Sequence, residues 1–272
     1  MVAAAEWRGV VSERNDGFDA LSIVAFVASA GGSWSGPIRV IGSDQNDYFV
    51  KCLETCPDSR ERMSLVIEQV VAEVGRLVGA PVCDTSLIRI SGELAGWEAR
   101  PGTKIAAGLA HASRALNRAD ERGRPNLYAR NRDDNSLRHV GVYALFDWCI
   151  GCDQQWLYDL DADQTIYSHD HGLYLPPIGH GFFTVEALKA EVLSPSILPD
   201  SPAGLNGAAI EQVAQALENI SRDDLIAILN RVPASWPATN EELEVLGWFL
   251  ECRAPHVAAR LRDLGSKVGS SQ

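Results

Sequence analysis

The hydrophobic pattern changes its period along the chain, and this change limits the folds that the sequence can adopt. Before about residue 90 most apolar runs are short and strand-like, whereas beyond residue 139 they recur with helical spacing. The strand-like runs are 21–27, followed by a small-residue turn over 28–33, then 37–41, 47–53 and 86–90, and the later helical runs are 139–151, 205–220, 221–231 and 240–264. Strands followed by helices are typical of the α+β class, and the turn at 42–46 favours an antiparallel hairpin.

One helix is expected inside the strand-rich part. Its apolar residues recur every three to four positions, and Gly79 follows as a stop signal. These residues are Met63, Ile67, Val70, Val71, Val74, Leu77 and Val78. A further helix is expected over 108–117, followed by a polar surface segment over 117–138. The composition changes in the glycine-containing stretch 91–102, which places the boundary between two lobes after residue 97, giving lobes 1–97 and 98–272.

The overall charge narrows the classes of partner. The 272 residues carry a formal net charge of −12, and the pI is about 4.9. Non-specific nucleic-acid binding is therefore not expected, because that affinity comes mainly from Lys and Arg that neutralise phosphates. A small anionic ligand is still compatible, since backbone N–H groups, one Lys and a divalent cation can hold phosphates locally.

The sequence also gives expectations for the compartment. No stretch approaches the roughly 18 apolar residues that a membrane helix needs, and the N-terminal residues lack the pattern of a secretion signal. The six cysteines show no spacing typical of a disulfide framework. We therefore expect a cytoplasmic protein with free thiols and no membrane contact.

A glycine-rich turn and a strand lysine are the first candidates for chemistry. Gly31, Gly32 and Ser33 lie between two expected strands, and Lys51 lies in the next strand. Glycines let backbone N–H groups approach phosphate oxygens, and a strand lysine can reach the same phosphates. Such a turn is also an ordinary hairpin connection. Glu68 in the following helix is a partner for Lys51, although Glu61 and Glu73 compete for that role on spacing alone.

Two loop aspartates are the second candidates. Asp153 follows the helix over 139–151, and Asp170 follows a short strand-like run. Phosphoryl transfer needs one carboxylate near the acceptor hydroxyl and another on a metal ion, although aspartates before turns are also common caps. Cys149 and Cys152 fit buried thiols better than a metal or redox site. The histidines His169, His171 and His180 fit loop-lining residues better than metal ligands.

Taken together and in order, these segments resemble the HipA-like kinase family in its short form, which lacks an additional N-terminal subdomain. The resemblance runs from about Leu21 to Arg260 and has no single strong motif. It is carried by Gly31-Gly32-Ser33, Tyr48-Phe49-Val50-Lys51, Glu68 placed eleven residues before Gly79-Ala80-Pro81-Val82, Gly108 to Ser113, Asp170-His171-Gly172 and Val232 to Trp236.

The resemblance implies a two-lobed protein-kinase-like fold, with an antiparallel sheet and one helix in the first lobe and a mainly helical second lobe. It implies an ATP- and Mg²⁺-dependent Ser/Thr protein kinase, with a protein substrate and an antitoxin or other protein partner. Lys51 would contact phosphates with Glu68 holding it, Asp153 would be the catalytic base, and Asp170 would bind the metal. Ser33 and Ser35 would be sites of autophosphorylation.

One position departs from the family pattern. Relatives carry a metal-binding Asn five residues after the catalytic Asp, and here that position is Tyr158. The second metal ligand is then Asp159, Gln155 or absent. Two alternatives to an active protein kinase follow, namely a pseudokinase-like nucleotide-binding module that acts through a protein partner, and a small-molecule phosphotransferase.

Overall fold

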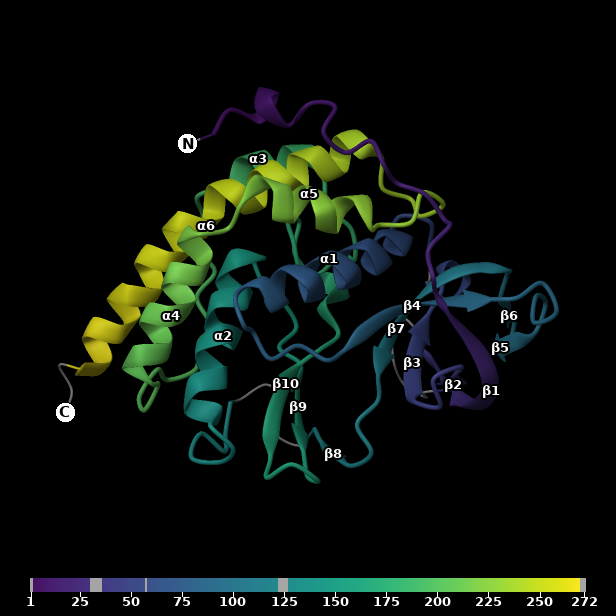
Figure 1. Cartoon of the computed structure of the whole chain (residues 1–272), viewed down its shortest axis with the longest axis horizontal. Helices are drawn as coiled ribbons and strands as arrows, with labels where there is room; N and C mark the ends of the chain where they lie inside the picture. The colour runs from purple at the N-terminus through teal and green to yellow at the C-terminus, as the bar shows by residue number, and fades with distance from the viewer. Residues whose placement is uncertain (1, 30–35, 57, 122–126, 270–272) are drawn as a thin grey trace.

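A five-stranded barrel and a helical region make up most of the fold (Figure 1). The computed structural model describes residues 2–29, 36–56, 58–121 and 127–269. Around the barrel the strands are ordered β1 (Leu21–Ser29), β2 (Ile38–Gly42), β3 (Asp47–Lys51), β7 (Gly108–Arg114) and β4 (Thr85–Ile90). The expected strands at 37–41, 47–53 and 86–90 are therefore confirmed, with boundaries shifted by a few residues.

The expected antiparallel sheet is present as a closed barrel with one parallel strand pair. All of its strand pairs are antiparallel except β1 and β4, which run parallel and meet at Leu21↔Ile88 and Ser22↔Arg89. These two pairs close the sheet on itself, and small or branched residues fill the interior, among them Val40, Val50 and Ala112. Because β4 pairs with β1 only at Leu21 and Ser22, closure covers the start of this β1 edge and not its full length.

Strand β7 corrects the helix expected over 108–117. Its small residues pack inside the barrel, and it pairs with both β3 and β4, from Lys51↔His111 to Thr85↔Ser113. Pairing with strands far away in sequence, rather than local propensity, decides its conformation. The strand lies after residue 98, so the expected boundary between 97 and 98 does not coincide with the edge of the barrel.

A hairpin fills the connection between β4 and β7. Its strands are β5 (Glu98–Arg100) and β6 (Thr103–Lys104), which pair antiparallel. Ala99 and Ile105 from this segment are buried in the same cluster as the barrel interior. The glycine-containing stretch that suggested a lobe boundary is thus part of the barrel's packing.

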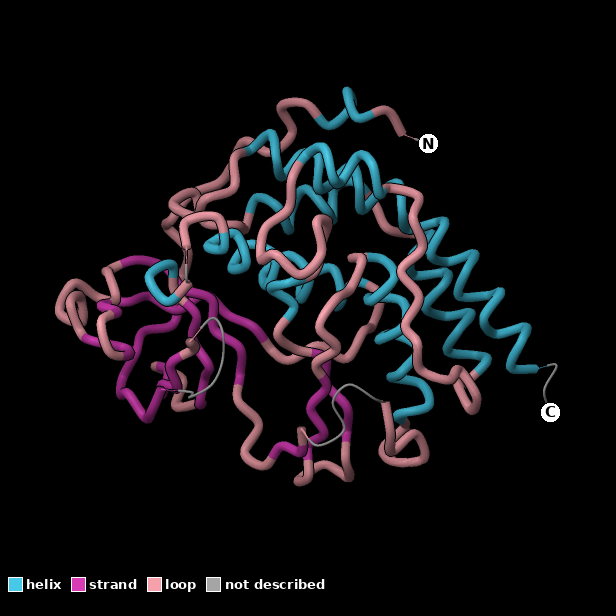
Figure 2. The backbone as a smooth tube through the Cα atoms, turned by 180° about the vertical axis from the view of Figure 1, so that it is seen from behind, coloured by secondary structure: helices cyan, strands magenta, loops and turns pink. Residues whose placement is uncertain are grey.

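The helical region surrounds α1 (Ser64–Leu77) and α2 (Asn135–Trp148). The remaining helices are α3 (Val185–Glu191), α4 (Gly207–Glu218), α5 (Arg222–Asn230) and α6 (Asn240–Gly269). All of the expected helices other than 108–117 are present, whereas the seven-residue α3 was not expected. Figure 2 shows from behind that the helices gather at one end and the barrel strands at the other.

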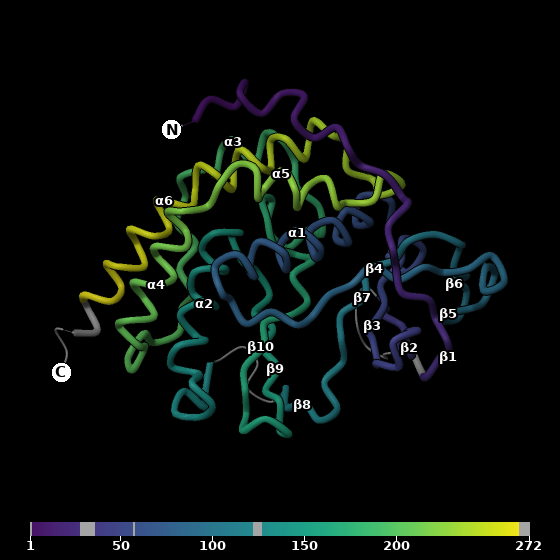
Figure 3. The backbone as a smooth tube through the Cα atoms, viewed as in Figure 1, coloured from purple at the N-terminus to yellow at the C-terminus, as the bar shows by residue number. Residues whose placement is uncertain are grey.

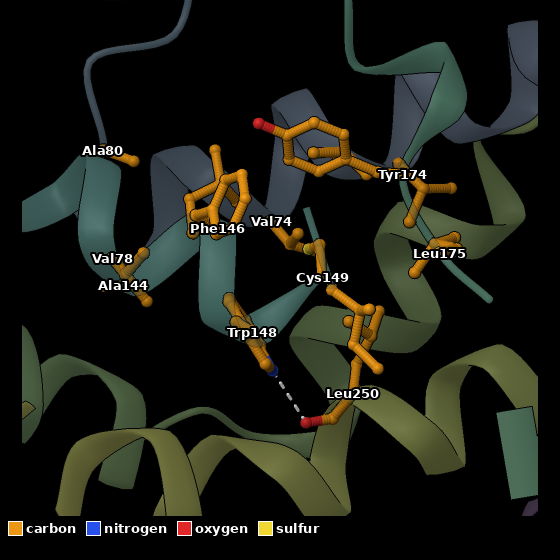
Figure 4. Close-up of a cluster of buried hydrophobic side chains, with 14 of the residues drawn as sticks. Val74, Val78, Ala80, Ala144, Phe146, Trp148, Cys149, Tyr174, Leu175 and Leu250 are labelled. Carbon is orange, nitrogen blue, oxygen red and sulfur yellow. Dashed lines mark hydrogen bonds between the residues drawn. The ribbon is translucent and has the colours of Figure 1, made fainter. Parts of the chain in front are cut away.

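The core of the helical region is one continuous apolar cluster. Figure 4 shows part of it, where Val74 of α1 lies near Phe146 and Cys149 at the end of α2. Trp148 is fully buried and donates its indole N–H to the Leu250 carbonyl of α6 at 2.9 Å. The apolar stripe of α1 thus packs against α2, and this fixes the position of its polar residues.

A small sheet extends from the helical region, with the strand order β10 (Thr165–Ser168), β9 (Trp156–Asp159) and β8 (Ala119–Asp120). Strand β10 ends beside the segment that follows α1, where Ser168 forms an isolated parallel bridge with Val82. The loop that follows β10 therefore begins close to the end of the segment that connects α1 to the barrel.

The N-terminal arm crosses the helical region before it enters β1 (Figure 3). Trp7 is buried and donates to Glu251 of α6 at 2.6 Å, and Val11 N–H donates to Glu244 at 3.3 Å. Arg14 donates to the carbonyls of Val232 and Ala238. Although residues 1–97 were expected to form one lobe, these contacts place the arm on the helices. Within the described residues no helix is both long and apolar enough to cross a membrane.

Candidate active site

Three charged side chains from distant segments meet between the barrel and the helical region. Lys51 lies at the end of β3, Glu68 lies in α1, and Asp170 follows β10. The Lys51 ammonium donates to Glu68 Oε1 and to Asp170 Oδ1. These three residues are called the Lys51 cluster below. Of the three candidate glutamates, the structure brings Glu68 to Lys51, while Glu73 contacts Gln69 and Arg76.

Burial and charge give the members of the cluster different proton affinities. Burial alone would lower the pKa of Lys51, but the carboxylates of Asp170 and Glu68 outweigh it and raise that pKa. Burial raises the pKa of Glu68 above its ordinary value. Burial also opposes ionisation of Asp170, yet the Lys51 charge keeps its pKa below the ordinary value. Lys51 and Asp170 are therefore charged at neutral pH.

Glu68 also fixes the loop that carries Asp170. Its two carboxylate oxygens accept the backbone N–H groups of Gly172 and His171, each at 3.1 Å. Gly172 eases this approach, because a Cβ there would make a tight contact of 3.1 Å with Glu68 Oε1. The expected Asp-His-Gly motif signalled this loop, but the sequence analysis did not foresee that its backbone binds Glu68.

Asp170 is the member of the cluster that faces outward. Its side chain is 33% exposed, compared with 5% for Glu68. Its φ of 55° is in the left-handed region, which Asp tolerates better than most residues. The carboxylate thus keeps access to a ligand while Lys51 holds one of its oxygens.

Asp153 lies close to this loop through Gln155. The Asp153 side chain is exposed and accepts a hydrogen bond from Gln155 Nε2 at 2.7 Å, and the Gln155 carbonyl accepts from His169 N–H at 3.3 Å. Asp153 also has a φ of 50°, so both candidate aspartates adopt the left-handed conformation. An exposed carboxylate at this point is accessible to an acceptor hydroxyl.

Asp159 is not brought to the cluster. It pairs with Thr165 in the β9–β10 hairpin, whereas Trp156 at the other end of β9 pairs with Ser168 near Asp170. At about 3.3 Å per residue, the three-residue step along β9 moves Asp159 roughly 10 Å away from that end. Its Oδ1 instead accepts the N–H of Asp161 at 2.9 Å. Strand β9 was not predicted from the sequence, and neither was the separation of Asp159 from Asp170 that it produces.

Tyr158 fills the position at which the sequence resemblance leads one to expect a metal-binding Asn. Its ring is fully buried and packs at a tilt of 37° against the Tyr128 ring with centroids 3.9 Å apart, and its hydroxyl accepts Tyr128 N–H at 2.8 Å. The tyrosine is therefore a packing residue. Gln155 Oε1, by contrast, is a buried oxygen with no hydrogen-bond partner among the described residues.

The donor atoms around Asp170 fit a magnesium ion. Mg²⁺ prefers oxygen ligands and often binds through only one or two protein side chains plus phosphates. Asp170 offers a charged, accessible carboxylate, and Gln155 offers an amide oxygen without a donor. No group of three or more His, Cys, Asp or Glu side chains suited to a metal is found within the described residues. The Asp170 carboxylate and the Gln155 amide oxygen are thus of the donor type that Mg²⁺ binds together with phosphates.

The remaining sequence candidates have other outcomes. Gly31, Gly32, Ser33 and Ser35 lie outside the described residues. Burial raises the pKa of Cys149 to about 12 and also raises that of Cys152, which is the behaviour of unreactive thiols. His171 is buried and contacts Ser168 Oγ at 2.7 Å, which agrees with a loop-lining role.

Comparison with known proteins identifies the architecture. No protein-family model and no curated protein matches the sequence. Among solved structures, the proinflammatory kinase CtkA of Helicobacter pylori is similar, with a TM-score of 0.58, 12% identity, and coverage of 92% of this chain and 98% of that chain. The Golgi casein kinase is also matched, with a TM-score of 0.46, 9% identity, and coverage of 98% and 77%. The chain therefore has a kinase-like fold.

Proposed function

We propose that the protein is an ATP-dependent kinase of HipA type that transfers the γ-phosphoryl group to Ser or Thr of a protein. The observation that carries the proposal is the Lys51 cluster, in which a buried lysine joins a helix glutamate to a loop aspartate in a kinase-like fold. In kinases this arrangement directs the lysine to the nucleotide phosphates and the aspartate to the metal.

Each residue then has a defined task. Lys51 binds phosphate oxygens, and Glu68 keeps its ammonium in place. Asp170 and the Gln155 amide oxygen would hold Mg²⁺, which would neutralise charge on the phosphates. Asp153 accepts the proton of the substrate hydroxyl, because its carboxylate is exposed beside the loop of Asp170.

The test is incubation of the purified protein with γ-labelled ATP and cell lysate. We expect labelled protein bands from the wild type, and a loss of at least about a hundredfold in the Asp153→Ala variant with ATP binding retained, because a catalytic base does not hold the nucleotide. Asp161→Ala is the matched control, since Asp161 lies in the exposed β9–β10 turn. Equal transfer by wild type and Asp153→Ala would refute the assigned role.

A second candidate function, a pseudokinase-like nucleotide-binding module, is favoured by one observation. The buried Tyr158 leaves no metal-binding Asn at its position. Such a module would bind ATP without consuming the γ-phosphate, and it would act through a protein partner. Label found in small molecules instead of protein bands would indicate a small-molecule phosphotransferase.

A more specific proposal is that the protein is the toxin of a toxin–antitoxin pair, and this proposal rests on the sequence resemblance. Induced expression in a bacterial host should then arrest growth, and Lys51→Met should abolish the arrest. Growth arrest that persists in the Lys51→Met variant would contradict a kinase-dependent toxin.

A further inference from the structure

The charge of the Lys51 cluster leaves a deficit for a nucleotide. Lys51 contributes one positive charge, which Asp170 cancels, and Glu68 adds a negative charge whenever it is ionised. The cluster therefore has no net positive charge, although a triphosphate carries several negative charges. A kinase site must supply positive charge from other groups in addition to the metal ion. This reasoning rests on the proposed function.

The β5–β6 hairpin is seated at the barrel end where Lys51 lies. By strand register, Ser29↔Ile38, Ile38↔Val50 and Ile90↔Gly108 all mark this end of the barrel. The hairpin lies between Ile90 and Gly108 in sequence, and so connects β4 to β7. Trp97 at its start stacks on Phe26 of β1 with ring centroids 3.9 Å apart. The hairpin thus has a fixed position beside the end of the Lys51 strand.

Arg100 extends from this hairpin to the segment that follows Lys51. Its Nη2 donates to the Thr55 carbonyl at 2.8 Å, and its Nε donates to Thr103 Oγ1 at 3.4 Å. Thr55 is itself tied to Cys52, the residue after Lys51, because the Thr55 hydroxyl donates to the Cys52 carbonyl at 2.9 Å. Two hydrogen bonds therefore connect the guanidinium to the residue that follows Lys51.

Arg100 also lies against Gly36, shortly before β2. Gly36 has a φ of 50°, and a Cβ at this position would lie only 2.4 Å from Arg100 Nη1. The guanidinium therefore lies directly on the Gly36 backbone, and a side chain at residue 36 would be strained by its positive φ and would displace the guanidinium. A surface pocket of about 720 Å³ opens beside it, lined also by Phe26 and Trp97.

The guanidinium has no counter-ion in the described part of the chain. No carboxylate lies within 4 Å of Arg100 there, and Nη1 has no acceptor among the described residues. Glu98 lines the same pocket, but its Oε1 accepts the N–H of Gly102 at 2.6 Å. A half-buried arginine with an unused donor is suited to bind an anionic oxygen.

We propose that Arg100 is a second cationic residue for the phosphate chain of the nucleotide, supplied by the β5–β6 hairpin. Lys51 and Arg100 then bind the phosphates from two sides, one from the strand end and one from the hairpin at the same end of the barrel. The planar guanidinium adds a directional contact that the lysine does not provide.

The test is a calorimetric titration of the full chain with ATP, ADP and AMP, each with Mg²⁺. Arg100→Met should weaken ATP binding by about tenfold, because a charge-assisted hydrogen bond to phosphate is lost. The loss should be smaller for ADP and absent for AMP, and Arg100→Lys should fall between wild type and Arg100→Met. Arg89→Met is the matched control, since Arg89 is also half-buried, lies in β4 and donates to two backbone carbonyls.

Each outcome decides the proposal. Unchanged ATP affinity in Arg100→Met overturns it while leaving the proposed function intact. An equal loss for all three nucleotides also overturns it, because Arg100 would then support the fold and not the phosphates. Thermal unfolding followed by circular dichroism verifies that both methionine variants are folded. If the wild type binds no nucleotide, the proposed function fails, and the role of Arg100 fails with it.

Discussion

Two buried ionic clusters in this molecule have opposite compositions. The Lys51 cluster has one cation and two carboxylates, whereas Asp147 at the end of α2 binds two cations, Arg253 and Arg260 of α6. Arg253 is fully buried and also donates to the carbonyls of Trp148, Glu191, Val192 and Ser194. The second set is called the Asp147 cluster below.

The difference lies in how completely the polar atoms are satisfied. In the Asp147 cluster both carboxylate oxygens accept hydrogen bonds from arginines, and Oδ1 also accepts the N–H of Ser196 at 3.0 Å. In the Lys51 cluster Asp170 remains one-third exposed. A saturated cluster has no capacity for a ligand and serves the fold. A cluster with an accessible carboxylate is suited to a site, at some cost in stability.

The largest effect on stability is expected in the Asp147 cluster. Arg253→Met should lower the free energy of unfolding by about 3–5 kcal/mol, because it leaves Asp147 and several backbone carbonyls buried without their donor. Urea denaturation measures the change. Arg260→Met is the control, since its partly exposed side chain leaves room for water, and its loss should be clearly smaller. Equal losses for the two variants would contradict the comparison.

A smaller loss of stability is expected in the Lys51 cluster. Lys51→Met should lower the free energy of unfolding by about 1–2 kcal/mol, because Glu68 can take up a proton and Asp170 can be hydrated. The same variant should bind no nucleotide measurably in the calorimetric titration. A destabilisation as large as that of Arg253→Met would show that the Lys51 cluster is mainly structural.

The pH dependence of stability should report buried histidines in both regions. Burial lowers the pKa of His171, beside the Lys51 cluster, and of His139, in α2, to about 3 from a usual value of 6.5. The unfolded state therefore binds these protons first. The free energy of unfolding should fall as pH decreases from 6.5 toward 3, by about 1.4 kcal/mol per pH unit for each histidine.

Glu68 acts in the opposite direction. Its pKa is raised in the folded state, so its contribution to stability is present at low pH and is lost as pH rises through that raised pKa. In urea denaturation between pH 5 and 6.5, the free energy of unfolding of the wild type should increase with pH. The His139→Gln variant should reduce this slope by the contribution of one histidine. An unchanged slope in that variant would show that His139 is protonated in the folded state.

The smallest effect is expected where the barrel and the helical region are joined. Trp236 is buried and donates its indole N–H to the Leu109 carbonyl of β7 at 3.0 Å. Trp236→Phe keeps most of the apolar contact and should cost about 1 kcal/mol. Fluorescence and circular dichroism should still report the same urea midpoint. Separate midpoints would show that this bond is needed for the two regions to unfold together.

Local patterns predicted the parts of the fold that depend on one segment. The apolar stripe of α1 is complete within fourteen residues, and it fixes which side of the helix Glu68 occupies. The positions of Lys51, Glu68 and Asp170 could be anticipated together because a known family orders them in the same way. Neither signal depends on which strands pair.

The parts that failed depend on distant partners. Strand β7 is defined by its pairing with β3 and β4, and its small residues alone do not distinguish a strand from a helix. Asp159 is a candidate metal ligand in the sequence because it is next to the position of the expected Asn, and its distance from Asp170 depends on the register of β9 against β10, which spacing does not reveal. Arg100 carried no sequence signal, since its contacts with Gly36 and Thr55 come from the seating of the hairpin.

The N-terminal arm constrains the order in which the molecule can be completed during synthesis. Trp7 contacts Glu251, and Trp248 donates to the Val2 carbonyl at 3.0 Å, so these partners are separated by 244 and 246 residues. On a ribosome the arm must wait until α6, more than 240 residues later, has emerged before its binding surface exists. Because β1 follows the arm directly, the segment that leads into β1 is fixed on the helical region only after α6 has formed.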